Sequence, residues 1–433
     1  MYFLRLVAAV AICALTAGAA GLTPAQRQLN ADSFEYAWKT IEKFMWQPMP
    51  VNWQAVHDEL KPKVEAAATM DDARAVMRDM ISRLNMTHFA IVPADVYDRL
   101  GAAKGHANSG GSTGFDMRLI GGEAIVAAVE PDSPAYRAGV RPGWQILRAG
   151  GTDLKDLITR LHSELRRSTV QDLLVTRAVA ATFDGAPGTT VDSEFLDGAD
   201  RRIRLGIELK APRGASAKIG FLPEQHVWYE SKRLGSVGYI RFNMFLDPAR
   251  ISAQFADSIQ SFIECAGLVI DLRGNPGGIG GMSLGMAGWL IDKSDVRLGV
   301  LKTKDTELKF IVNPRAEVYR GPVAILVDSL TASTSEIFSG GLKDLGRARI
   351  FGTRTAGAAL PSAFERLPNG DGFQYAMANY ISEGGQPLEG IGVTPDVEAP
   401  LSRQALLGRH DPALEAALAW IDGRRQDNKE SQK

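Results

Sequence analysis

Four short apolar stretches in the second half of the chain constrain its fold most strongly. Helical or glycine-rich sequence separates these stretches, which are SVGYIRFNMF (236–245), GLVIDLRG (267–274), GPVAILVDS (321–329) and RARIFGT (347–353). Strands that are apolar along their whole length are typical of parallel sheets, because helices cover both faces of such a sheet. The sequence therefore predicts an α/β domain over 217–422 with buried, largely parallel strands.

The chain ahead of this segment has a different periodicity. Apolar residues recur at three- and four-residue intervals in DSFEYAWKTIEKFMW (32–46) and MDDARAVMRDMISRLNM (70–86), which predicts helices. We expect a small helical domain over 20–104. The Gly/Ser-rich GHANSGGSTG (105–114) then predicts a linker or loop. A chain of 433 residues is too long for one ordinary core, so several domains are expected.

The first residues have the pattern of an export signal. Arg5 precedes an apolar run over 6–15 and a small-residue site at 17–19, a combination typical of a secretory signal over 1–19 and too short for a comfortable membrane helix. A buried N-terminal helix is the alternative. We expect an exported protein, bacterial periplasmic or secreted, with no integral membrane span once the signal is removed. Cys265 would then be the only cysteine, which excludes an internal disulfide.

Charge and ligand spacing argue against several classes of partner. Lys and Arg number 49 against 50 Asp and Glu, a formal net charge of -1, so neither a nucleic-acid surface nor a polybasic membrane anchor is expected. His, Cys and acidic residues show no metal-ligand spacing, and no metal or other cofactor is predicted. The oligomeric state is not determined by the sequence. Residues 423–433 are predicted to be a solvated polar tail.

Residues 112–212 resemble a PDZ domain. The resemblance rests on the loop Thr113-Gly114-Phe115-Asp116 and on the later motifs Ser133-Pro134-Ala135, Ala138-Gly139-Val140 and Pro142-Gly143. A glycine-containing loop before a strand can offer N–H groups to a terminal carboxylate while the strand edge pairs with the peptide. With the preceding linker, a β-rich PDZ-like domain over 105–212 is implied, with peptide binding at Gly114, Phe115, Asp116 and Met117. Alternatively, these glycines only make turns.

The stretch LVDSLTASTSEIFSGGLKD (326–344) passes from an apolar strand through small hydroxyl residues into a helix. Ser333 with Glu336 three residues later fits an S/T-x-x-E helix cap. A Ser at a strand-to-helix turn also fits an exposed nucleophile near the positive end of a helix, with backbone N–H groups beside it for an oxyanion. Both interpretations can hold for Ser333.

A second motif, VIDLRGNPGG, ends an apolar strand with the pair Gly277-Gly278. Glycines after a strand let backbone N–H groups approach a ligand without a Cβ in the way, which suits an oxyanion hole. Together with the Ser333 segment, the motif supplies both halves of an acyl-transfer site.

The order of GYIRFNMF, DLRGNPGG, SLTASTSEIFSGGLKDLGRARIFGTRTAG and PLEGIGVTPD resembles that in the tail-specific, or C-terminal processing, serine proteases and their tricorn-core relatives. The resemblance covers 217–400. It implies an α/β peptidase core of the ClpP/crotonase type, Ser333 as nucleophile, and Gly277, Gly278 and Thr334 as the oxyanion hole. Ser335 suits the nucleophile less well, because it lies one step further into the helix.

One position departs from the tail-specific pattern. Ala358 in TRTAGAA stands where that branch has its general-base Lys, and Arg354 cannot replace it because a guanidinium stays protonated. The tricorn-like branch uses a His beside a small hydroxyl residue, and a Glu near the C-terminal G-V-x-P-D element. Thr87-His88 and Glu389 match those positions, with Glu383 as an alternative acid. A His suits general-base work because its reference pKa is about 6.5.

These observations predict an exported serine endopeptidase that binds a protein or peptide with a free C-terminus and cleaves the tail through an acyl-enzyme. Ser333, His88, Glu389 and Thr87 are the expected catalytic residues. Two alternatives stay open: a catalytically inactive relative that acts as a PDZ-type peptide-binding protein, and a non-peptide acyl hydrolase on the same scaffold.

Overall fold

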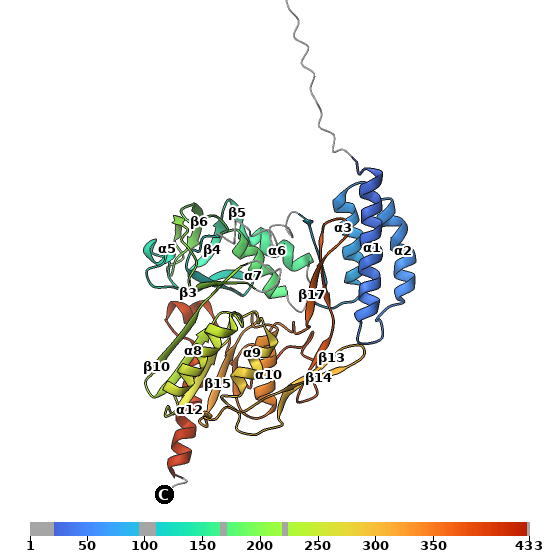
Figure 1. Cartoon of the computed structure of the whole chain (residues 1–433). Coiled ribbons are helices and arrows are strands. Elements are labelled where there is room, and N and C mark those ends of the chain that lie inside the picture. The colour runs from blue at the N-terminus through green and yellow to red at the C-terminus, as the bar shows by residue number, and fades with distance from the viewer. Residues whose placement is uncertain (1–20, 95–109, 165–170, 219–223, 431–433) are drawn as a thin grey trace, which may run out of the picture.

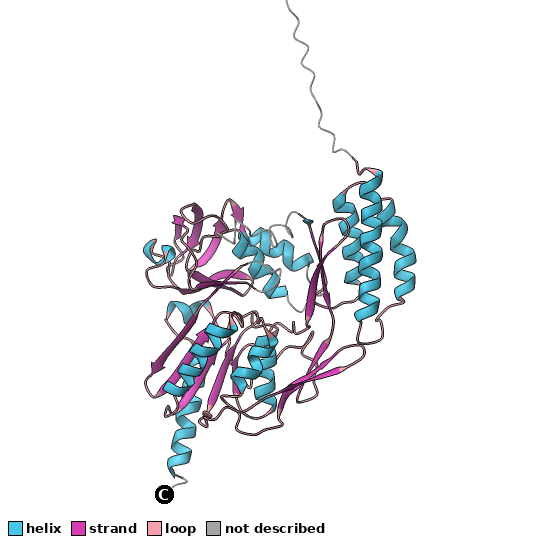
Figure 2. Ribbon diagram, viewed as in Figure 1, coloured by secondary structure: helices cyan, strands magenta, loops and turns pink. Residues whose placement is uncertain are grey.

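The computed structural model describes residues 21–94, 110–164, 171–218 and 224–430 (Figures 1 and 2). The predicted signal and the first half of the predicted linker lie outside these residues. The expected fold class, with a helical first segment, a β-rich middle segment and an α/β last segment, is confirmed. No helix in the described ranges is long and apolar enough to cross a membrane.

Three helices follow one another in the first segment. Side chains of Thr23, Asn52 and Thr69 cap their N-termini. The chain then enters a short strand that pairs antiparallel with a strand from 280 residues later. These elements are α1 (Pro24–Phe44), α2 (Trp53–Glu65), α3 (Met70–Ser82) and β1 (Ala90–Val92), and the sheet order is β1-β18 (Gly372–Ala376)-β17 (Ser362–Arg366).

The helical segment shares its core with this late part of the chain. Phe34 and Met77 from the helices are fully buried in one cluster with Phe373 from β18. The two segments therefore fold together, and the helices hold β1, with the Thr87-His88 turn just before it, against the C-terminal half of the molecule.

The middle segment is an antiparallel sheet with β2 at one edge and α7 packed against β2. The sheet order is β2 (Phe115–Ile120)-β3 (Glu123–Val129)-β4 (Gln145–Ala149)-β6 (Thr190–Leu196)-β7 (Arg202–Glu208), and β5 (Thr152–Asp153) pairs with β4. Its helices are α5 (Pro134–Arg137), α6 (Leu154–Glu164) and α7 (Gln171–Ala181). An edge strand beside a helix leaves one row of backbone groups free to pair with an extended peptide.

The last segment contains the sheet that the four apolar stretches predict. Its order is β10 (Tyr229–Leu234)-β11 (Val237–Phe242)-β12 (Gly267–Asp271)-β15 (Val323–Val327)-β16 (Arg349–Gly352)-β20 (Val397–Glu398). The strands from β11 to β20 are parallel and β10 is antiparallel. Every residue of β12 and β15 is buried, as expected for strands covered on both faces.

Helices cover both faces of this sheet, and successive strand residues face them in turn. Ile325 packs toward α8 (Pro248–Ser261), α9 (Gly280–Ala287) and α10 (Thr334–Asp344), whereas its neighbours Ala324 and Leu326 pack toward α12 (Pro412–Glu430). The smaller elements are β8 (Ala215–Ala217), β9 (Gln225–Val227), β13 (Arg297–Lys302), β14 (Glu307–Ile311), β19 (Asn379–Ser382) and α11 (Arg403–Leu407). The residues predicted to be a polar tail are helical as far as Glu430.

Two ion pairs join the middle segment to the sheet of the last segment. Arg118 on β2 donates to Asp328 at 2.7 Å, and Arg241 on β11 donates to Asp116 on β2 at 2.9 Å. Asp328 follows β15 and also accepts the N–H of Gly274 at 2.9 Å. The edge strand β2 is thus held directly above the carboxyl ends of the central parallel strands.

Candidate active site

Ser333 occupies a strained turn between β15 and α10. It is the N-cap of α10 with φ 55° and ψ -121°, a conformation that non-glycine residues rarely adopt. The N–H of Glu336 donates to the Ser333 carbonyl at 2.8 Å, so the turn does not need the hydroxyl as the acceptor for that group. Ser333 is partly exposed, whereas Thr334 and Ser335 beyond it are buried.

The hydroxyl groups of Ser335 and Thr334 form hydrogen bonds inside the protein. Ser335 is fully buried and donates to Asn275 Oδ1 at 2.9 Å. Thr334 donates to the carbonyl of Gly278 at 2.8 Å. Both hydroxyls fasten α10 to the loop after β12, which leaves Ser333 as the accessible hydroxyl of this run.

The glycine turn after β12 contacts the Ser333 turn directly. A Cβ on Gly277 would lie 2.7 Å from both the Cβ of Ser333 and the N of Thr334, and the φ of Gly277 is +93°. Its N–H already donates to Asn275 Oδ1 at 3.0 Å. Within the described part of the chain, the N–H groups of Gly278 and Thr334 have no hydrogen-bond acceptor. Of the three expected oxyanion donors, these two have free N–H groups.

Glu336 is buried and accepts four hydrogen bonds next to Ser333, whereas the sequence predicted it only as part of a helix cap. Its carboxylate accepts the N–H groups of Ser333 and Ala358 at 2.9 Å, the N–H of Gly357 at 2.8 Å and the Thr355 hydroxyl at 2.5 Å. Burial raises the pKa of Glu336 to about 7, and the four donors oppose that shift. Four donors fill the acceptor capacity of the carboxylate, so Glu336 holds the Ser333 turn against the segment that carries Thr355 and Ala358.

Thr87, His88 and Glu389 come together although they are distant in sequence. The N–H of Thr87 donates to one oxygen of Glu389 at 2.8 Å, and the N–H of Ala359 donates to the other at 3.2 Å. Thr87 Oγ1 and His88 Nδ1 lie 2.6 Å apart. Glu383, the alternative acid, instead pairs with Arg297 at 2.5 Å.

A two-residue segment connects this group to Ser333. The Ser333 N–H also donates to the Ala358 carbonyl at 2.9 Å, and the next residue, Ala359, bonds to Glu389. Ala358, where the tail-specific branch has its Lys, is buried against Ala332 and Ala356. A continuous set of hydrogen bonds therefore runs from Ser333 through this segment to Glu389, Thr87 and His88.

The environment of His88 favours the neutral imidazole. Burial lowers the pKa of His88 to about 4, and the positive charge of Arg177 acts in the same direction. This value is well below the reference of about 6.5 that the sequence alone suggests. His88 is therefore neutral, and able to accept a proton, across the physiological pH range. Glu389 also has a raised pKa, because it is buried.

The four residues expected to bind peptide lie on β2 and the turn before it. Gly114 has a φ of +75°, and a Cβ there would lie 2.2 Å from Ser133 Cβ, so the turn requires glycine. Its N–H donates to Ser112 Oγ at 3.0 Å. Phe115 packs edge-on against Phe183, Asp116 pairs with Arg241, and Met117 is buried.

A cavity of about 350 Å³ lies between β2, α7 and the glycine turn of the last segment. Phe115 and Met117 line it from β2, Thr176 from α7, and Gly274 and Pro276 from the loop after β12. The expected peptide strand and the loop that carries Gly277 thus border one space.

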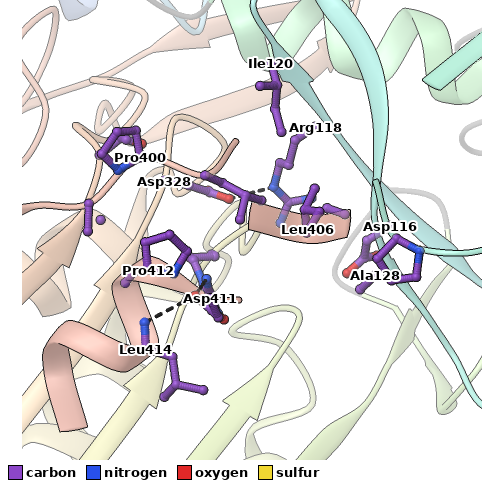
Figure 3. Close-up of a pocket in the computed structure, with 18 of the residues that line it drawn as sticks. Asp116, Arg118, Ile120, Ala128, Asp328, Pro400, Leu406, Asp411, Pro412 and Leu414 are labelled. Atoms are coloured by element: carbon purple, nitrogen blue, oxygen red, sulfur yellow. Dashed lines mark hydrogen bonds and ion pairs between the residues drawn. The ribbon is translucent and has the colours of Figure 1, made fainter. Parts of the chain in front are cut away.

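A second, larger cavity of about 1430 Å³ also lies between the middle and last segments (Figure 3). It is bounded by β2 and β3, by α11 and by the start of α12, and Arg118 reaches across it to Asp328. Neither Ser333 nor His88 is among the described residues that line it. The candidate catalytic residues therefore lie apart from this larger space.

Comparison with known proteins identifies the last segment. Residues 236–399 match the model of peptidase family S41, and residues 27–82 match that of the tricorn protease C1 domain. The last segment is therefore similar to a peptidase family S41 domain. The predicted resemblance to C-terminal processing and tricorn-core serine proteases is thereby confirmed, and the S41 match includes the strands and loops that carry Ser333, Gly277 and Glu389.

Curated proteins similar to this chain are named as processing proteases. It is 26% identical over 294 residues to a probable CtpA-like serine protease of Staphylococcus aureus, covering 66% of this chain and 51% of the relative. It is 28% identical over 298 residues to a chloroplastic C-terminal processing peptidase of Tetradesmus obliquus, covering 68% and 61%. The chain thus spans about half the length of the first relative.

Solved structures show the same fold. The photosystem II D1 C-terminal processing protease superposes with a TM-score of 0.56 at 22% identity, covering 89% of this chain and 95% of that one. Mature CPAF superposes with a TM-score of 0.60 at 15% identity, covering 92% and 96%. At these identities the likeness concerns the fold alone.

Proposed function

We propose that this chain is a serine endopeptidase that cleaves C-terminal tails of proteins through an acyl-enzyme at Ser333. The observation that carries the proposal is the set of hydrogen bonds that runs from Ser333 through Ala358-Ala359 to Glu389, Thr87 and His88. It supplies a candidate base in an S41-like domain whose Lys position holds alanine. Export, predicted from residues 1–19, is part of the proposal.

In the first half-reaction, His88 Nε2 accepts the proton of the Ser333 hydroxyl while Oγ attacks the scissile carbonyl carbon. For Nε2 to accept, Nδ1 must carry a hydrogen and donate it to Thr87 Oγ1, which lies 2.6 Å away. The Thr87 hydroxyl is then free to donate to Glu389, the carboxylate that also accepts its N–H. In this arrangement Thr87 and Glu389 fix the orientation and tautomer of His88.

The tetrahedral intermediate places a negative charge on the former carbonyl oxygen. The free N–H groups of Gly278 and Thr334 are the proposed donors to that oxygen, with the Gly277 backbone packed against Ser333. The carbon–nitrogen bond then breaks, and the imidazolium gives its proton to the leaving amine. In the second half-reaction, water attacks the acyl ester with His88 again as base, which releases the acid product and restores Ser333.

Substrate capture is proposed at the open edge of β2. An extended peptide that adds to this edge would run along α7 and border the cavity that the loop before Gly277 also lines. The turn around Gly114 would face the free C-terminus of the tail. A PDZ-like role for the middle segment is therefore a component of the proposal.

The decisive experiment incubates the purified protein with a folded carrier protein that ends in an unstructured tail, and identifies the products by mass spectrometry. We expect cleavage within the tail by the parent protein and none by Ser333→Ala. Binding of the tail without cleavage would instead favour the inactive peptide-binding relative. Hydrolysis of simple esters without any peptide cleavage would favour the non-peptide acyl hydrolase.

A further inference from the structure

Helix α7 of the middle segment reaches the residues that flank Ser333. Leu173 on this helix packs against Ala332, Ala356 and Ala358, the buried cluster beside the Ser333 turn. Residues three and four positions apart lie on the same helix face. Thr176 is three positions beyond Leu173 and lines the cavity that extends to the glycine turn. The face of α7 that includes Leu173 and Thr176 is therefore turned toward the candidate catalytic residues.

Arg177 lies on this face, four positions beyond Leu173, and is the single cation of α7. No hydrogen bond or ion pair links its guanidinium to any residue in the described ranges, whereas Arg118 pairs with Asp328 and Arg241 with Asp116. Its side chain is open to solvent, yet surrounding protein lowers the pKa of the guanidinium. Arg177 is thus accessible to a dissolved ligand on the face of α7 that also carries Leu173.

The positive charge of Arg177 affects His88, the candidate base. It is the charged group that acts on His88, and it lowers the pKa of that imidazole. A guanidinium stays charged at any physiological pH, so this face of α7 carries a permanent cation with no ion-pair partner among the described residues. A planar guanidinium binds a carboxylate through two parallel hydrogen bonds.

We propose that Arg177 is an anion-binding subsite beside the Ser333 turn, which takes a carboxylate of the peptide substrate and so determines specificity near the scissile bond. This inference rests on the proposed function, because it assumes that a peptide substrate binds beside Ser333. Two sources supply the same chemistry: an Asp or Glu side chain flanking the scissile bond, or the terminal α-carboxylate of the tail.

The test measures binding, so that it does not depend on turnover. Fluorescent alanine-rich peptides are titrated into Ser333→Ala by anisotropy, with one Asp moved through successive positions and Asn at the same positions as the neutral match. A second arm compares the free acid with the C-terminal amide. We expect Ser333→Ala to bind at least one Asp peptide, or the free acid, about tenfold or more tightly than its neutral match.

Variants of Arg177 and of a control arginine then test whether Arg177 causes that preference. Adding Arg177→Met should abolish the preference, Arg177→Lys should keep part of it, and Arg148→Met should leave it intact, because Arg148 lies on β4 beside Asp153. If only the Asp and Asn peptides differ in affinity, Arg177 binds a side-chain carboxylate. If only the free acid and the amide differ, Arg177 binds the terminal carboxylate of the peptide. An equal preference with and without Arg177, or no preference in either arm, overturns the inference.

Failure of the proposed function has a different signature. A parent protein that cleaves no tail, while its Ser333→Ala variant still prefers carboxylate peptides through Arg177, would refute the peptidase and retain the subsite. In an active parent, the Arg177→Met change should raise KM for the preferred peptide about tenfold with a smaller effect on kcat. A loss confined to kcat would indicate a structural effect on His88 and would contradict the subsite.

Discussion

The N–H of Thr87 donates a 2.8 Å hydrogen bond to the carboxylate of Glu389, across 302 residues of sequence. Through this bond the turn before β1, held by the N-terminal helices, meets the loop before β20. His88 follows Thr87, and Ala359, which donates to the other oxygen of Glu389, follows the residue bonded to Ser333. The candidate base is therefore positioned from the far end of the chain.

Replacing Glu389 by Gln should slow the reaction without preventing peptide binding. The carboxylate accepts N–H groups on both oxygens, so an amide would turn its NH2 toward one of these donors and lose that bond. We expect kcat to fall at least about tenfold with KM changed much less. Glu383→Gln is the matched control, because Glu383 pairs with Arg297. Loss of activity in Glu383→Gln with full activity in Glu389→Gln would reverse the assignment.

Replacing Ser333 and replacing Ser335 should have different effects on activity and stability. Ser333→Ala removes the accessible hydroxyl and should abolish cleavage while the protein keeps its thermal stability. Ser335→Ala removes a buried hydrogen bond to Asn275 and should cost about 1 kcal/mol of stability while activity persists. Cleavage assays and calorimetric melting on both variants check this. An inactive but stable Ser335→Ala would mean that the wrong hydroxyl has been chosen.

A methyl group at Gly277 should damage the site through geometry alone. Its Cβ would lie 2.7 Å from Ser333 Cβ and from the N of Thr334, and the φ of +93° is strained for alanine. We expect Gly277→Ala to lower kcat at least about 10²-fold, the usual scale for a disturbed oxyanion site. Gly281→Ala in α9 is the control, since nothing lies within 4 Å of its Cβ. Similar activity in the two variants would contradict this geometry.

Glu336 should give the protein a pH-dependent stability. Its pKa is raised to about 7 from an ordinary 4.5, so between these values the folded state binds more protons than the unfolded state. Its contribution is fully present below about pH 4.5 and is lost as the pH rises through about 7. Urea unfolding of the parent and of Glu336→Gln across this range should show a smaller decline in the variant. Parallel curves would contradict the raised pKa.

Periodicity and local motifs were sufficient for much of the fold. The four apolar stretches became β11, β12, β15 and β16, and the Ser333 and Gly277 turns lie in contact because both follow neighbouring parallel strands. Local sequence could not reveal that Glu336 accepts four donors, because Thr355 and Ala358 reach it only after the chain folds back.

Arg177 and the low pKa of His88 were likewise not predictable from the sequence. A guanidinium without a partner differs from a paired one only through its surroundings, and α7 meets the Ser333 turn only when the middle segment docks on the sheet. The ion pairs Arg118–Asp328 and Arg241–Asp116 that accompany this docking carry no sequence signature. Such long-range contacts determine the charges around His88, which residue spacing along the chain cannot predict.

The central claim is that His88 activates Ser333, and the rate of covalent labelling by a fluorophosphonate tests it most directly. We predict one adduct, on Ser333, formed by the parent at a rate that changes less than about twofold from pH 5.5 to 7.5, because His88 with a pKa of about 4 is neutral throughout. His88→Ala should label at least about 10²-fold more slowly, and the exposed control His410→Ala at the parent rate. Labelling of His88→Ala at the parent rate, or an adduct on Ser335, would contradict the account.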